Sequence, residues 1–457
     1  MKSFAKASRV AAVAGFFLMF SPVVGRGEGS LEFTAAETIL RLEDLEQMAL
    51  EGNPTIAQSS AQVRAAEGRR LQVGLYPNPT VGYVTEEFSA SNPSARSQHY
   101  FFFSQRLVTA GKLAKSRSIF AREQAQAEAE KEEQKQRVLN AVRMLYDEAL
   151  GAERLVEVRR ELARIAREAV GISGELYNIG QADRPDLLEA EIESERAELD
   201  LVNAGNDREL VWRLLASVVG NPELRPTLLD GDIEGETPAL DREKALARLL
   251  DESPEIKVAR AAVERAKAAL ERARAEPIPD IFLRAGFGYN LDVREPQGFL
   301  ELGVPLPIFD RNQGNIAAAR AELTRAEEEM RRLELALRSL LASTFRNYQN
   351  SLAATERYRT AIIPRAQKSY DLYLARFREM AAAYPQIIIA QRTLFQARAD
   401  YIQALITLRR NVTAIAGMLL TGGLTPPGDA FPEKGITAGA MPGVRTGTEG
   451  AELVEKR

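Results

Sequence analysis

Two stretches of the chain alternate apolar and polar side chains, although the sequence around both has helical periodicity. Residues 277–290 read PIPDIFLRAGFGYN, and residues 77–88 read PNPTVGYVTEEF. A period of two is typical of a β-strand with two unlike faces. A second alternating run follows each stretch, so the pattern predicts two strand pairs, at about 79–89 with 97–107 and at about 280–290 with 298–307.

The predicted strands separate their side chains by type. The apolar face of the second pair comprises Ile281, Leu283, Ala285, Phe287, Tyr289, Leu300, Leu302, Val304 and Leu306. The matching face of the first pair comprises Val81, Tyr83, Thr85, Phe101, Phe103, Gln105 and Leu107, while Tyr100 and Phe102 make its second strand apolar on both sides. Strands of this length can cross a hydrocarbon layer at a tilt, and a soluble antiparallel sheet would show the same alternation. Four strands cannot close a barrel in lipid, so a membrane location would require several copies to pool their strands.

The remaining sequence predicts long helices. The longest runs from about 111 to 179 without a proline, and the turn GQADRP separates it from a returning helix at 186–219. A helix at about 40–75 precedes the first strand pair. The two shorter helices together match the longest one, so they could lie end to end along its length of ~100 Å. The second half predicts a helix before its strands, then helices at 314–378 and 386–420, the former kinked at Pro364.

The helices and strands recur as an internal repeat. Asn53-Pro54 is answered by Ser253-Pro254, and Pro185 is answered by Pro385, each at an offset of 200 residues. Recurring turn signals at one offset indicate duplication. We therefore predict two structural repeats, at about 30–220 and 241–420, joined by a linker at 221–240.

One face of the last predicted helix shows how the helices pack. Its apolar residues follow one another in steps of four and three: Tyr401, Leu405, Leu408, Val412, Ile415 and Leu419. Such steps form the seam of a coiled coil, and an ordinary helix bundle can show the same spacing. The length of the helices favours the coiled coil.

The two ends of the chain differ from its middle. Residues 1–29 combine basic residues, an apolar run and a zone of small residues, which predicts a secretory signal peptide, with an N-terminal membrane anchor as the alternative. No later run approaches eighteen consecutive apolar residues, so we expect no transmembrane helix in the mature protein. Residues 421–457 are rich in Gly, Pro and Thr, and this composition predicts a disordered tail.

The composition argues against several functions. The net charge of −4 and the interleaving of Lys/Arg with Glu do not favour a nucleic-acid partner. The absence of Cys removes disulfides and thiolate metal sites, and a Ser-His-Asp triad would have to use His99. The carboxylates in EAEKEEQK (128–135) are more typical of a solvated helix face than of a metal site. We therefore expect no enzyme, no cofactor and no resident metal.

Several motifs resemble those of the TolC family of outer-membrane efflux proteins. They are GLYPNP (74–79), SQRLVTAGKLAKSR (104–117), YNIGQADRPDLLEAE (177–191), LPIFDRNQGNIAAARAE (306–322) and AQRTLFQAR (390–398). The resemblance covers about residues 40–420. Within the family, LPIFDRNQGN looks most like the CzcC-like heavy-metal efflux branch, which serves exporters of the resistance-nodulation-division class.

The resemblance implies a fold, a location and partners. The fold is a mixed α/β membrane protein, mostly long α-helices, with four β-strands per protomer in a trimeric twelve-stranded outer-membrane β-barrel. The helices would form a coiled-coil α-barrel across the periplasm of a Gram-negative bacterium. The homotrimer would be a passive exit duct in a tripartite efflux system, supplied by a periplasmic adaptor and an inner-membrane pump. Outer-membrane lipid would surround the barrel. The resemblance leaves the cargo open between heavy-metal ions, drugs and other substrates.

The resemblance also implies roles for particular residues. The adaptor-docking periplasmic tip would comprise Gly180, Gln181, Ala182, Asp183, Arg184, Pro185, Met380, Ala383, Tyr384 and Pro385. The candidate gate comprises Asp183, Arg184, Asp186, Glu189 and Gln386, with helix capping and solvated charge as the alternative role of its charged members. The candidate lumen residues of the barrel are Arg106, Arg284 and Glu301.

Two other hypotheses compete with the duct. One is a periplasmic coiled-coil scaffold or adhesin-like rod without a pore, whose hairpins form a soluble sheet. The other is an exported hydrolase that depends on His99 or on a pair of carboxylates. A soluble, non-conducting protein would favour the rod.

Overall fold

The computed structural model describes residues 39–87, 98–291, 293–378 and 384–427. The predicted signal peptide, the tip residues Met380 and Ala383, and most of the predicted tail lie outside these residues. The elements, in chain order, are α1 (Leu42–Gly52), α2 (Pro54–Val73), β1 (Thr80–Glu86), β2 (Gln98–Leu107), α3 (Lys112–Asn178), α4 (Arg184–Val219), α5 (Arg242–Glu252), α6 (Pro254–Ala275), β3 (Ile281–Asn290), β4 (Glu295–Gly303), α7 (Gln313–Arg357), the π-helical turn η1 (Tyr358–Ile362), α8 (Ile363–Arg378) and α9 (Tyr384–Ala416).

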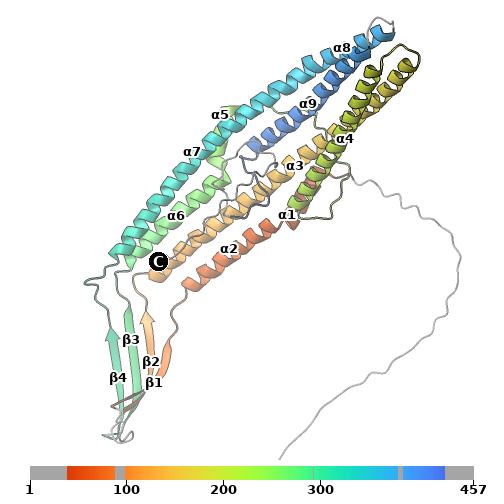
Figure 1. Ribbon diagram of the computed structural model, residues 1–457. Helices are drawn as coiled ribbons and strands as arrows, with labels where there is room; N and C mark the ends of the chain where they lie inside the picture. Colours follow the sequence, from red (N-terminus) through yellow and green to blue (C-terminus); the bar gives the residue numbers. More distant parts are fainter. Residues whose placement is uncertain (1–38, 88–97, 292, 379–383, 428–457) are drawn as a thin grey trace, which may run out of the picture. The chain divides into compact units, whose positions relative to one another are not determined.

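The strands and the helices are arranged in the same order. The sheet is antiparallel throughout, with the order β1-β2-β3-β4. The helices that lead into and out of these strands pack as α2 on α3, α3 on α6, and α6 on α7 (Figure 1). Farther from the sheet the neighbours are α4, α3, α9 and then α7 and α8. One protomer is therefore a layer of helices that continues the sheet, with α2 and α4 at one edge and α7 and α8 at the other, and α4 also contacts α9 directly near the helix turns.

The predicted helix at 40–75 is wrong in one respect, because it breaks at Asn53. The Asn53 side chain accepts a hydrogen bond from the Thr55 N–H (2.9 Å), which caps α2, and Pro54 occupies its first turn. Proline fits this position because it has no N–H to leave unpaired. The chain breaks in the same way at Ser253-Pro254, between α5 and α6. The recurring Asn-Pro and Ser-Pro pairs thus begin new helices.

Three other predicted helices differ from the structure. Helix α4 begins at Arg184 rather than at residue 186, and α9 runs from Tyr384 to Ala416 rather than from 386 to 420. Met418 and Leu419 have positive φ angles of 57° and 64°, which no α-helix accommodates. The helix predicted at 314–378 is divided by η1, in which the Ile363 N–H bonds the Tyr358 carbonyl, immediately before Pro364. The kink predicted at this proline is therefore a π-helical turn.

The second strand of the second hairpin is shifted from its predicted range. Strand β4 covers Glu295–Gly303, whereas the alternation predicted 298–307. Pro305 and Pro307 cannot donate to a ladder, so the pairing ends before them. Val304 and Leu306 continue the apolar alternation but lie outside the sheet.

The disorder predicted for residues 421–457 is wrong for the segment 421–427, which we call the C-terminal strap. Its carbonyl groups accept hydrogen bonds from buried side chains at residues 53, 134 and 137. Arg137 donates to the Thr421 carbonyl (3.0 Å), Asn53 to that of Gly423 (3.2 Å) and Gln134 to that of Thr425 (3.1 Å). A composition rich in Gly and Pro does not reveal these long-range bonds.

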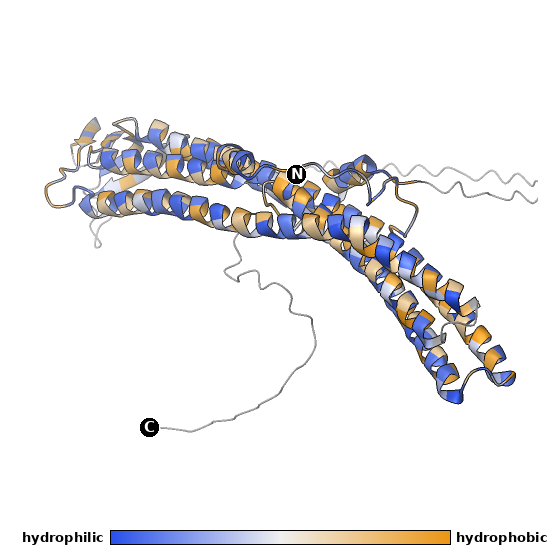
Figure 2. Ribbon diagram, turned by 90° about the horizontal axis from the view of Figure 1, so that it is seen from above, coloured by the Kyte–Doolittle hydropathy of each residue, from blue (hydrophilic) through white to orange (hydrophobic). Residues whose placement is uncertain are grey.

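The buried apolar residues form separate clusters along the layer. One, around Trp212, joins α1, α3 and α4, and another, around Leu408, joins α5, α6, α7 and α9. The seam predicted on the last helix is divided between two clusters. Tyr401 and Leu405 pack with Ile233 in a third cluster, whereas Leu408 and Ile415 belong to the cluster around Leu408. Apolar and polar residues alternate along the helices in Figure 2, as expected for helices that each bury only part of their surface.

Candidate functional site

The four-stranded sheet has two chemically different faces. Directly paired residues of an antiparallel sheet lie on the same face, and the pairs Arg284–Glu301 and Phe101–Phe287 define the two. Within the strand bounds given above, every Asp, Glu, Lys or Arg lies on the face of Arg284: Glu86, Arg106, Arg284, Glu295 and Glu301. The three candidate lumen residues therefore share one face.

The other face of the sheet is apolar and exposed. Val81 is 76% exposed, Phe101 73%, Phe287 68% and Leu300 70%. These residues come from all four strands, so the apolar surface is continuous across the sheet. A continuous exposed surface of this kind indicates contact with lipid or with another protein.

The sheet also has two open edges. Among the described residues, β1 pairs only with β2, and β4 only with β3. The outer N–H and C=O groups of β1 and β4 are therefore available to other strands. In a hydrocarbon layer such groups must be paired, so a sheet of this kind would have to be completed by further chains.

A buried carboxylate ties the start of β3 to the chain around the end of β2. Asp280 is 3% exposed and accepts hydrogen bonds from Arg106 Nε (2.8 Å), the Thr109 N–H (3.0 Å) and Lys112 Nζ (3.0 Å). These bonds fix the junction between strands and helices, and they hold one of the candidate lumen residues, Arg106. Sequence reasoning missed Asp280 and Lys112, although Asp280 directly follows the conspicuous Pro-Ile-Pro.

The first half of the predicted tip is a helix turn with capped ends. Gly180 has a φ of 73°, and the Gln181 N–H bonds the Leu176 carbonyl at 2.8 Å. The Asp183 N–H donates to Asp186 Oδ2 (3.4 Å), so the two aspartates form the capping box of α4. The Arg184 guanidinium lies 5.9 Å from the centre of the Tyr177 ring. This geometry gives Asp183 and Asp186 a capping role, and a gating role for them stays a prediction.

The other residues grouped as a gate are divided between two helices. Glu189 is exposed on α4, and Gln386 is exposed on α9, where it lines a cavity beside Ser369 and Tyr373. Ile387 and Ile388, which follow Gln386, are buried against Ala190 of α4. The apolar residues after the second turn therefore form part of the core between α4 and α9.

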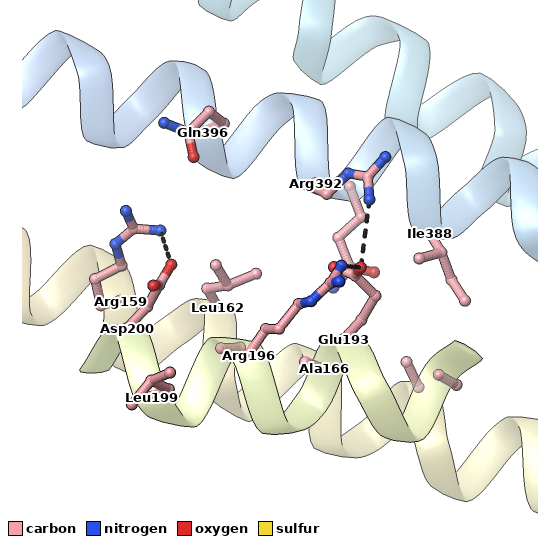
Figure 3. Close-up of a pocket in the computed structure, with 14 residues that line it drawn as sticks. Arg159, Leu162, Ala166, Glu193, Arg196, Leu199, Asp200, Ile388, Arg392 and Gln396 are labelled. Atoms are coloured by element: carbon pink, nitrogen blue, oxygen red, sulfur yellow. Dashed lines mark hydrogen bonds and ion pairs between the residues drawn. The ribbon is translucent and has the colours of Figure 1, made fainter. Parts of the chain in front are cut away.

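A connection between α4 and α9 was missed by sequence reasoning. Glu193 of α4 accepts from Arg196 (2.8 Å) on its own helix and from Arg392 (3.3 Å) on α9, beside a cavity of about 240 Å³ (Figure 3). At the same cavity Arg159 of α3 pairs with Asp200 of α4 (2.8 Å). Arg392 belongs to the motif AQRTLFQAR, and this motif was the signal in the sequence that could have directed attention to Arg392. The Glu193–Arg392 ion pair is thus a polar link between α4 and α9 near the turns.

Two kinds of feature are absent from the described part of the chain. None of its helices combines the length and the apolar character needed to cross a membrane. Within the same residues, no group of three or more His, Cys, Asp or Glu side chains is placed to hold a metal ion.

An apolar sheet face, open sheet edges and a continuing layer of long helices define the class of outer-membrane channel protomers. The family model described as "Outer membrane efflux protein" matches residues 45–221 and 245–419. The chain therefore belongs to the outer membrane efflux protein family, which confirms the resemblance drawn from the motifs. Its location is the outer membrane of a Gram-negative bacterium, with the helical part in the periplasm.

Individual relatives agree with this family. The chain is 23% identical over 382 residues to the cobalt-zinc-cadmium resistance protein CzcC of Cupriavidus metallidurans. The matched region covers 83% of this chain and 90% of the relative. Its fold is similar to that of the outer-membrane channel OprN, with a TM-score of 0.69, 18% identity, and 84% of this chain and 91% of the other covered. It is also similar to the outer membrane protein VceC of Vibrio cholerae, with a TM-score of 0.67, 19% identity, and 84% and 97% covered.

The family decides between the competing hypotheses. Its members are trimeric outer-membrane channels that work with adaptors and inner-membrane pumps, and they are passive conduits rather than enzymes. The exported hydrolase is therefore excluded, and the pore-free rod finds no support.

Proposed function

We propose that three copies of this chain form the exit duct of a tripartite efflux system that exports heavy-metal cations. The observation that carries the proposal is the sidedness of the sheet. Every charged strand residue lies on one face, and large exposed apolar residues cover the other. A barrel of twelve strands built from three such sheets would turn the apolar face to lipid and the charged face to a wet lumen.

The edges of the protomer support a trimer closed side by side. Besides the open strands β1 and β4, the edge helix α4 exposes a row of apolar side chains on one side: Leu188, Ile192, Leu199, Leu210 and Leu214. These positions recur at helical spacing, so they form a stripe along α4. In a closed ring, the α4 edge of one protomer faces the α7–α8 edge of the next, which would bury this stripe.

The helix turns far from the sheet are the proposed docking surface for the periplasmic adaptor. The residues predicted for this surface are Gly180–Pro185 and Met380–Pro385, of which residues 380–383 lie outside the described part of the chain. An inner-membrane pump of the resistance-nodulation-division class would deliver the cargo through that adaptor. The similarity to CzcC, which covers 90% of that relative, supports cobalt, zinc or cadmium as the cargo class.

The duct is tested by purifying the protein from outer-membrane fractions and measuring its conductance in planar bilayers. The Leu210→Asp variant places a charge in the α4 stripe, where Leu210 is 55% exposed in the single protomer. We expect it to lose the trimer in gel filtration and to lose conductance, because the buried charge would be unpaired. Leu210→Met is the matched control and should remain trimeric. A conducting trimer of Leu210→Asp would refute the proposed contact, and a non-conducting wild-type protein would refute the duct.

A further inference from the structure

Arg284 occupies an unusual position on the charged face of the sheet. It lies in the middle of β3, and its guanidinium carbon is 4.4 Å from the ring centre of Phe102 on β2 and 5.3 Å from that of Phe299 on β4. A cation this close to two aromatic rings is attracted to both. The guanidinium is therefore held by rings from the strands on either side of it.

Glycines on neighbouring strands allow the two rings to lie against the sheet. The Phe102 ring occupies the space where Gly82 of β1 would carry a Cβ, and the Phe299 ring occupies that of Gly286 on β3. Any side chain at either glycine would collide with the ring. Each ring thus lies over a glycine on the face of the sheet that carries Arg284, and together the rings form a base for its guanidinium.

Further contacts hold this base in place. Tyr100, which is 6% exposed, meets the Phe299 ring edge to face with 5.4 Å between ring centres. Its hydroxyl donates to Gln98 Oε1 (2.5 Å) and lies 3.1 Å from Gln297 Oε1, which accepts from Asn290 (3.3 Å). The Tyr100 ring that packs against Phe299 is therefore anchored by its hydroxyl.

Glu301 is the more exposed partner of the ion pair. It lies opposite Arg284 in the register, with 3.8 Å between Arg284 Nη1 and Glu301 Oε2. The Arg284 side chain is 33% exposed, whereas that of Glu301 is 63% exposed. The strand face as a whole carries three glutamates and two arginines, which leaves one net negative charge per protomer. A solute at this face therefore meets the carboxylate before the guanidinium.

We propose that Glu301 and Arg284 form a cation-selective band in the wall of the duct, with Glu301 presented to the lumen and Arg284 held back by Phe102 and Phe299. The inference rests on the proposed function, which turns this face to the lumen. Three Glu301 carboxylates would surround the path of the cargo. The neighbouring guanidinium limits the strength of each carboxylate as a ligand, so the band admits hydrated cations without retaining them. Conduction requires sites that are this weak.

The test is the reversal potential of the trimer in planar bilayers under a gradient of KCl, which reports the permeability ratio of potassium to chloride. Glu301→Gln should lower this ratio at least about twofold, because the charge that cations meet first is gone. Arg284→Gln should raise it, because the carboxylate loses its counter-charge. Glu301→Asp keeps the charge and should stay close to wild type. Glu252→Gln, which removes an exposed charge from α5 and not from the strands, is the matched control and should leave the ratio unchanged.

The outcomes separate the inference from the proposed function. A conducting Glu301→Gln trimer with the wild-type ratio overturns the cation-selective band and leaves the duct intact. If that variant fails to assemble, the Arg284→Gln trimer still decides, since an unchanged or lower ratio there also overturns the inference. A wild-type protein without any conductance overturns the duct itself, and with it the band.

Discussion

A buried arginine shared by two carboxylates makes the stability of this protein depend on pH. Arg137 of α3 is 5% exposed and pairs with Glu133 on its own helix and with Glu255 on α6, where Nη2 and Oε1 are 3.6 Å apart. Burial and the neighbouring charge of Glu133 raise the pKa of Glu255 from 4.5 to about 7, against the opposing effect of Arg137. Burial also raises the pKa of Glu133. The cluster therefore binds a proton more tightly in the folded state than in the unfolded chain.

The sign and size of the effect follow from this difference. Proton binding by Glu255 stabilises the folded state fully below pH 4.5, which is the ordinary pKa of a glutamate. This stabilisation is lost as the pH rises through the folded-state pKa of about 7. One pKa unit corresponds to about 1.4 kcal/mol, so the loss is on the order of 3 kcal/mol for this residue. Glu255→Gln keeps the size and hydrogen-bonding capacity of the protonated side chain without its titration. We expect this variant to be more stable than wild type at pH 8 and to lose the part of the pH dependence that Glu255 contributes.

The measurement is denaturant unfolding of the detergent-solubilised protein at pH 5, 6.5 and 8. Glu252→Gln is the matched control, because this neighbouring glutamate is 52% exposed and pairs with Arg248 on the same helix. It should change the unfolding free energy by less than about 0.5 kcal/mol at each pH. If wild type and Glu255→Gln keep a constant difference across the three pH values, the assignment of the titration to Glu255 is refuted.

Two further predictions use pairs of equivalent or neighbouring residues as their own controls. Asn53→Ala should destabilise the protein by about 2 kcal/mol in thermal unfolding, because it removes the cap of α2 and the buried hydrogen bond to the Val218 carbonyl (2.7 Å). Ser253→Ala at the equivalent position should have little effect, since the Ser253 hydroxyl makes no hydrogen bond; equal losses at the two positions would contradict the capping argument. Glu193→Ala breaks the link from α4 to Arg392 on α9 and should raise the conductance of the resting trimer in planar bilayers. Glu209→Ala, whose ion pair lies within α4, should not, and identical conductance in both variants would exclude the link from gating.

Local patterns explain what could be predicted from the sequence. The bounds of α3 differ by one residue at each end from the predicted helix. The signals that predict it, the absence of proline and the glycine turn after the helix, are both local. The two faces of the strands followed from a period of two, which is also local. The same reasoning failed where a local pattern was ambiguous. The alternation ran on through Val304 and Leu306, but pairing in β4 ended at Gly303 because prolines cannot donate.

The candidate functional residues show more clearly what local sequence patterns cannot predict. Arg284 and Glu301 could be assigned to one face from the alternation within each strand. The Phe102 and Phe299 rings that hold Arg284, however, come from β2 and β4, on either side of its own strand. Asp280 looked like an ordinary polar residue before a strand until the fold brought Arg106 and Lys112 to it. The charged members of the candidate gate all lie between residues 183 and 189, whereas the ion pair that joins α4 to α9 connects Glu193 with Arg392.

The sequence by itself determined the long helices, the two hairpins, the sidedness of the strands and membership of the efflux family, because each depends on periodicity or on motifs within short segments. The tertiary structure alone decided which buried charges share partners, where the C-terminal strap at residues 421–427 is held, and which member of the Arg284–Glu301 pair is the more exposed. Those features depend on burial and on distances between groups far apart in the chain. Hydrogen bonds and ion pairs gain their strength from such surroundings, which no local pattern contains.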